Sequence, residues 1–107
     1  MDREIMKGSI DILMLSLVAK KDMYGYEMVK RLKEESENLY HMSEGTLYPA
    51  LKRLEKKGLL TSYWSETQAG RRKYYSITDD GKVVLQQKLN HWESINGLIS
   101  KMSEDLL

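Results

Sequence analysis

The chain has 107 residues, of which 41% are hydrophobic and 31% are charged, and its formal net charge at pH 7 is only +1. This profile is typical of one folded domain and excludes a disordered chain. No run of residues approaches the ~18 apolar side chains that a membrane span requires, and the lack of cysteine excludes disulfides, thiolate zinc sites and cysteine nucleophiles, so we expect a cytoplasmic protein.

Three helices are expected first along the chain. Apolar residues at helical spacing predict them over residues 5–19, 24–35 and 44–57. Ser43 is the expected N-cap of the third helix, and Gly58 is the expected left-handed residue that ends it.

A hairpin and a long helix are expected to follow. Aromatic residues on both sides of a polar, glycine-containing tip predict a hairpin over residues 60–78. Thr78 is expected to cap a final helix over residues 79–107, whose first turn begins with two aspartates. The predicted fold is mostly α with a small β-hairpin: a winged helix-turn-helix over residues 1–78, with the final helix in the same compact unit.

Basic residues are concentrated in the middle of the chain. Residues 20–75 contain 12 Lys or Arg and 8 Asp or Glu, a net charge of +4, whereas residues 79–107 carry −2. A helical wheel of the third helix places a basic, low surface opposite the leucines, consisting of Gly45, Pro49, Lys52, Arg53 and Lys56. Because the major groove of B-DNA is about 12 Å wide and admits one helix, this surface and a basic hairpin tip favour DNA binding.

Other interpretations fit the same residues. The lysines can be an ordinary solvated face, and a basic tip often only protects the edge of a hairpin. Winged helices also serve as protein–protein interaction modules that never bind DNA. An enzyme is not expected, because the sequence has no phosphate loop, no nucleophile elbow and no grouped metal ligands, and we expect no cofactor.

Four segments carry a family resemblance: YGYEMVKRL, SEGTLYPALKRLEKKGLL, GRRKYYSIT and DDG. Together they resemble the signature of PadR-family transcriptional regulators, over nearly the whole chain from residue 5 into the last helix. The resemblance implies a dimeric winged-helix repressor of the short branch, with a single C-terminal dimerisation helix. Together with the basic face, it gives these expected DNA-binding residues: Tyr24, Gly25, Tyr26, Ser43, Gly45, Thr46, Tyr48, Pro49, Lys52, Arg53, Arg71, Arg72 and Lys73.

The final helix predicts dimerisation without the resemblance. Its apolar residues recur as in a coiled-coil seam over three heptads, and only part of such a stripe can pack on its own domain. The expected dimer interface consists of Leu85, Leu89, Trp92, Ile95, Ile99, Met102 and Leu106. A two-fold dimer would bind an inverted repeat in double-stranded DNA, with half-sites about one helical turn apart.

Trp92 supports two interpretations. The resemblance implies that some relatives bind flat aromatic compounds between the two copies of this helix, at a Trp in this position. Trp92, with Leu89 and Asn96, could stack a planar aromatic ligand that releases the repressor. A Trp that only fills the dimer core explains the sequence equally well.

Overall fold

The computed structural model describes the backbone of residues 3–106 and the side chains of residues 8–106. Residues 1 and 2 of the predicted winged helix-turn-helix and residue 107 of the predicted final helix lie outside this range. The elements are α1 (Arg3–Lys20), β1 (Met23–Tyr24), α2 (Gly25–Glu35), α3 (Glu44–Lys56), β2 (Leu60–Thr67), β3 (Gly70–Ile77) and α4 (Asp79–Ser103). The predicted fold class, mostly helical with a winged helix and a long last helix, is confirmed.

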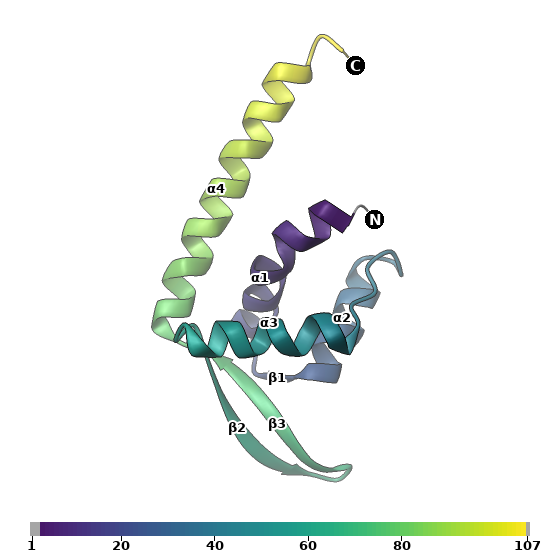
Figure 1. Ribbon diagram of the computed structural model, residues 1–107, viewed down its shortest axis with the longest axis vertical. Coiled ribbons are helices and arrows are strands. Elements are labelled where there is room, and N and C mark those ends of the chain that lie inside the picture. Colours follow the sequence, from purple (N-terminus) through teal and green to yellow (C-terminus); the bar gives the residue numbers. More distant parts are fainter. Residues whose placement is uncertain (1–2, 107) are drawn as a thin grey trace.

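The molecule is elongated, with extents of 55 × 30 × 21 Å. Helices α1, α2 and α3 form the body, and the β2–β3 hairpin, which we call the wing, projects from one end of it (Figure 1). Helix α4 leaves the root of the wing in the opposite direction and runs past α1, with its outer half clear of the body (Figure 1). No helix within the described residues is long and apolar enough to cross a membrane.

A short third strand was not predicted. A helix was expected to begin at Tyr24, but Met23 and Tyr24 form β1 and pair with Tyr75 and Tyr74 of β3. The sheet order is therefore β1-β3-β2, with β3 in the centre. This pairing ties the start of α2 directly to the wing.

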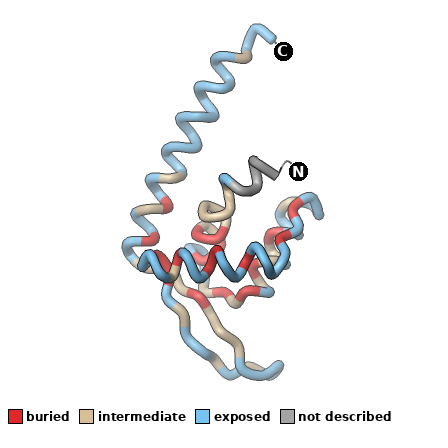
Figure 2. The backbone as a smooth tube through the Cα atoms, viewed as in Figure 1, coloured by how far each residue is buried: buried red, intermediate tan, exposed pale blue. Residues whose placement is uncertain are grey.

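The core lies where the three helices of the body meet the root of the wing, and Figure 2 shows the buried residues gathered there. Its most fully buried side chains are Met14, Leu15, Val18, Met23, Met28, Leu47, Leu51, Leu54 and Leu60. Leu85 of α4 belongs to the same core and is only 8% exposed. The first turns of α4 are thus part of the body, whereas its outer turns are exposed (Figure 2).

A compact junction joins α3, the wing and α4. Gly58 ends α3 with a φ of 78°, as predicted. Thr78 caps α4, as predicted: its Oγ1 accepts a hydrogen bond from the Gly81 amide at 2.9 Å and donates one to the Gly58 carbonyl at 2.7 Å. A Cβ atom on Gly81 would lie only 2.2 Å from the Leu59 carbonyl oxygen. The direction in which α4 leaves the body therefore depends on close backbone packing.

Candidate nucleic-acid interface

A groove of about 480 Å³ lies between the start of α2, α3 and the wing. It is lined by Tyr24, Gly25, Tyr26, Tyr48, Trp64, Arg71, Arg72, Lys73 and Tyr75. The structure thus brings together, from three separate segments, residues that the sequence analysis had named as DNA-binding candidates. Trp64 and Tyr75 also line the groove and had not been named.

The start of α2 forms one wall of this groove. Tyr24 is the N-cap residue of α2, but its side chain makes no capping hydrogen bond. Gly25 is buried, and a Cβ atom there would meet the Tyr48 ring at 3.3 Å, so the small residue lets α3 pack closely against this helix end. The amides of a helix N-terminus attract anions, which makes this wall suitable for a phosphate group.

The outer face of α3 is exposed. Its surface residues include the predicted candidates Ser43, Gly45, Thr46, Tyr48, Pro49 and Lys52. Ser43 is the N-cap residue, as predicted, but its Oγ donates to Thr46 Oγ1 at 3.3 Å instead of capping a backbone amide. Pro49 lies inside α3 and cannot donate the usual hydrogen bond to the Gly45 carbonyl. The front of α3 therefore presents a low surface with polar groups that are not all used within the helix.

Arg53 lies apart from this groove. Its guanidinium pairs with the Asp11 carboxylate of α1, although the helical wheel had placed Arg53 with the DNA-binding face. The reason is its position on the flank of that face, at a helical angle that points it toward α1 rather than away from the body. We therefore expect Arg53 to contribute less to DNA contact than Lys52, and its DNA contact stays a prediction.

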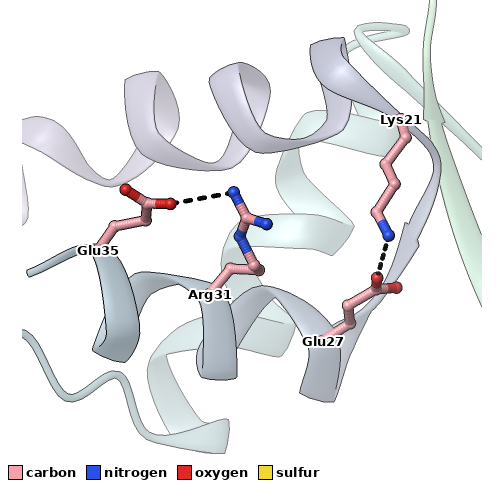
Figure 3. Close-up of polar contacts among 4 residues, drawn as sticks. All are labelled: Lys21, Glu27, Arg31 and Glu35. Carbon is pink, nitrogen blue, oxygen red and sulfur yellow. Dashed lines mark hydrogen bonds and ion pairs between the residues drawn. The ribbon is translucent and has the colours of Figure 1, made fainter.

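Ion pairs distinguish two groups of basic residues. Lys21 pairs with Glu27 at 2.8 Å, and Arg31 pairs with Glu35 at 3.0 Å along α2 (Figure 3). Within the described residues, no such carboxylate partner is found for Lys52 of α3 or for the three wing cations, Arg71, Arg72 and Lys73. The positive charge at the groove is therefore available to an external anion.

Tyrosine side chains pack between the wing and β1. Tyr63 stacks on Tyr74 with 5.8 Å between ring centres, and Tyr74 meets Tyr24 edge-on at 5.5 Å. The Tyr63 hydroxyl donates to Asp22 at 2.6 Å, and this bond raises the pKa of Tyr63 above its ordinary value. Burial likewise raises the pKa of Tyr75. The base of the wing is thus held against the turn that precedes α2.

A second cavity, of about 250 Å³, lies between α1 and α4. Its lining consists of Gly8, Asp11, Ile12, Arg53, Lys88, His91, Trp92 and Ile95. Trp92 is the predicted ligand-binding residue, but Leu89 and Asn96, which had been expected beside it, do not line this cavity. The Arg53–Asp11 ion pair forms part of its wall instead.

The outer part of α4 carries exposed apolar side chains. The predicted interface residues Leu89, Trp92, Ile95, Ile99, Met102 and Leu106 are between 40% and 81% exposed. Leu85, which had been expected in the same interface, is instead covered by the core of its own chain. We call these six exposed residues, of which Leu106 lies just beyond the end of α4, the α4 stripe.

Comparison with known proteins identifies the family. A profile of the transcriptional regulator PadR-like family matches residues 14–87, which is more than half of the chain. The chain belongs to the PadR-like family. Its members are transcriptional regulators rather than enzymes, which confirms the resemblance stated from the sequence and makes this PadR-family protein a DNA-binding regulator.

Individual relatives agree with this assignment. A PadR family transcription regulator from Clostridium difficile R20291 is 43% identical, with a TM-score of 0.80 over 88% of this chain and 97% of that one. A transcriptional regulator from Clostridium thermocellum is 39% identical, with a TM-score of 0.84 over 92% and 96%. The negative transcriptional regulator PadR of Bacillus subtilis is 31% identical over 80 residues, 73% of this chain but only 41% of that relative.

Proposed function

We propose that this PadR-family regulator is a homodimeric repressor that binds an inverted repeat in double-stranded DNA and is released by a planar aromatic molecule. The observation that carries the DNA-binding part is the groove between α2, α3 and the wing, where Arg71, Arg72 and Lys73 meet Tyr48 and the α2 N-terminus. Repression is supported by the Bacillus subtilis relative, which is described as a negative regulator.

The groove suggests how the protein would lie on DNA. The exposed face around Gly45, Pro49 and Lys52 enters the major groove, where Gly45 and Pro49 let the backbone come close to the base edges. The start of α2 meets a phosphate of the flanking strand, and the wing cations neutralise the backbone beside it. A purely protein-binding winged helix would not need these unpaired cations.

Dimerisation is supported by the α4 stripe. Its outer members, from Ile95 onward, are between 52% and 81% exposed within the described residues. Figure 2 shows the outer turns of α4 exposed beyond the body. A second copy of the same helix, related by a two-fold axis, would bury both stripes at once. The two α3 helices of such a dimer would then face two half-sites.

Release by a ligand is supported by the cavity beside Trp92. Trp92 and Ile95 offer an aromatic and an apolar surface on α4, and Arg53 on the opposite wall belongs to the helix that enters the major groove. A planar molecule stacked on Trp92 would compete with the Arg53–Asp11 contact and so move α3 relative to α1. The competing role for Trp92 is to fill the dimer core without binding a ligand.

The family membership also supports a cytoplasmic location for the protein.

Fluorescence anisotropy with the DNA upstream of the protein's own gene tests this proposal. Measured at several salt concentrations beside an unrelated duplex, affinity for the upstream DNA should be higher and should fall steeply with salt, because phosphate neutralisation releases counterions. Equal, salt-insensitive binding to both duplexes would contradict the proposed operator recognition.

The ligand is tested on the same complex. Planar aromatic dyes added to the protein–DNA complex should lower the anisotropy, and a Trp92→Leu variant that still dimerises should lose this response. If the response survives in Trp92→Leu, the aromatic pocket is not the ligand site.

A further inference from the structure

Each of the three cations on β3 lies over an aromatic ring. The Arg71 guanidinium carbon is 4.9 Å from the centre of the Trp64 ring, and the Arg72 carbon is 4.2 Å from that of Tyr24. The Lys73 Nζ is 5.7 Å from the centre of the Tyr75 ring. All three distances are within the range of about 6 Å over which a ring attracts a cation.

Trp64 stands out among these rings because it is 56% exposed. Tyr75 is buried in the core, and Tyr24 packs edge-on against Tyr74, so both have structural roles besides holding a cation. Trp64 lies opposite Lys73 in the β2–β3 register, so its side chain shares a face of the wing with Arg71, two residues along. Core packing does not explain a large exposed indole at this place.

The contact with the Trp64 ring leaves the guanidinium N–H donors of Arg71 without a hydrogen-bond partner among the described residues. An aromatic ring covers the flat face of a guanidinium, whereas the N–H donors lie in its plane and point outward at the edge. Within the described residues, no ion pair joins Arg71 to Glu66, its direct neighbour across the hairpin. The N–H donors of Arg71 are therefore open to a phosphate, while the contact with Trp64 already holds its long side chain in one place.

We propose that Trp64 is a positioning residue for DNA binding: its indole holds the Arg71 guanidinium in the wall of the groove, ready to bind a backbone phosphate. The proposal rests on the DNA interface proposed above. A side chain ordered before binding loses less conformational entropy when the phosphate arrives, so the benefit appears as affinity. Trp64 itself makes no contact with DNA in this arrangement.

A matched pair of variants tests the role of the ring. Trp64→Leu keeps an apolar side chain but removes the aromatic face, whereas Trp64→Phe keeps a smaller ring. We expect Trp64→Leu to weaken binding of the upstream duplex by about twofold to fivefold for each wing, and Trp64→Phe to weaken it less. Equal affinity of Trp64→Leu and the parent protein would overturn the proposal, and thermal unfolding of both variants verifies that the wing is folded.

The salt dependence separates positioning from loss of the wing. Arg71→Ala should reduce the slope of log K against log salt by about 0.9 for each wing, because one phosphate contact disappears. Trp64→Leu should leave that slope unchanged, since the phosphate contact is kept but formed at greater entropic cost. A slope reduced by more than one contact would mean that the wing has collapsed, and it would overturn the positioning role.

A double-mutant cycle shows through which residue Trp64 acts. In an Arg71→Ala background, Trp64→Leu should have no further effect, whereas in an Arg72→Ala background its full effect should remain, because Arg72 lies over Tyr24. A full effect in the Arg71→Ala background would show direct DNA contact by the indole instead. If Arg71→Ala leaves the DNA affinity unchanged, the proposed interface fails. If Arg71→Ala weakens binding but Trp64→Leu leaves the affinity unchanged, the interface stands and the positioning role of Trp64 fails.

Discussion

The wing and the outer half of α4 both project from the body and both expose large side chains, but their surroundings differ. On the wing, Trp64 lies beside a guanidinium, and the neighbouring residues on β3 are cations. On α4, apolar residues such as Ile95 and Ile99 follow one another along the exposed outer turns of the helix. The first surface suits a hydrated polyanion, and the second suits another apolar surface from which water is expelled.

The largest effect is expected from a charge placed in the α4 stripe. Ile99→Asp should dissociate the proposed dimer, because an unpaired charge buried in an interface costs about 3–5 kcal/mol. The monomer would keep its fold but bind only one half-site. Analytical ultracentrifugation together with circular dichroism measures both properties.

An exposed polar position on the same helix provides the control. Asn90→Asp adds the same charge outside the stripe and should leave the protein dimeric. An Ile99→Asp protein that sediments like the parent would reject α4 as the dimer interface.

A smaller effect on stability is expected at the junction that joins the two regions. Gly81→Ala places a Cβ atom against the Leu59 carbonyl, and overpacking of this kind costs about 1–3 kcal/mol. Gly97→Ala, on the outer part of α4, meets nothing within 4 Å and should instead stabilise the helix by about 0.5–1 kcal/mol. Urea unfolding of the two variants would contradict this comparison if both shifted the midpoint in the same direction.

A pair of single substitutions on α3 sharpens the boundary between the two surfaces. Lys52→Ala should weaken DNA binding and reduce its salt dependence, because Lys52 is exposed on the face proposed to enter the groove. Arg53→Ala should change DNA affinity less, since its guanidinium pairs with Asp11, and should instead alter the response to an aromatic ligand. Anisotropy titrations of both variants measure the two affinities. A larger loss of affinity in Arg53→Ala than in Lys52→Ala would show that Arg53 contacts DNA despite its ion pair with Asp11.

The smallest effect concerns the root of the wing at high pH. Because burial raises the pKa of Tyr75, the unfolded chain loses this proton at a lower pH than the folded chain does. The stability contributed by Tyr75 is therefore complete below about pH 10, the ordinary value, and is lost as the pH rises through its higher folded value. Thermal melts between pH 8 and 11 should show a shallower decline for Tyr75→Phe than for the parent. Burial also raises the pKa of Tyr40, so part of the decline in stability should persist in Tyr75→Phe.

Much of the fold could be predicted from the sequence because its elements carry strong periods. Helical spacing of apolar residues located α1, α2 and α3 to within a few residues, and Gly58 and Thr78 marked where α3 ends and α4 begins. β1 was missed because two residues are too few to show an alternation, and only pairing with Tyr74 and Tyr75 makes them a strand.

The candidate sites were harder to predict, because a helical wheel shows the faces of one helix but not which residues of other elements lie beside them. It grouped Arg53 with Lys52, and nothing in the sequence near Arg53 reveals that Asp11 lies beside it. Leu85 matched the heptad as well as Trp92 did, yet it lies close enough to the body to be buried there. For Trp64 a signal did exist: alternation along the hairpin would have placed it on the same face as Arg71.

The junction at Thr78 has a consequence for the spacing of the operator. A single residue separates β3 from α4, and hydrogen bonds to the Gly58 carbonyl and the Gly81 amide lock it in place. In the proposed dimer, α4 would hold the two winged helix-turn-helix units at a fixed distance and orientation. Inserting one base pair between the half-sites turns one of them by about 34–36° and moves it by about 3.4 Å. The affinity of the proposed dimer would then depend on the spacing between the half-sites as strongly as on their base sequence.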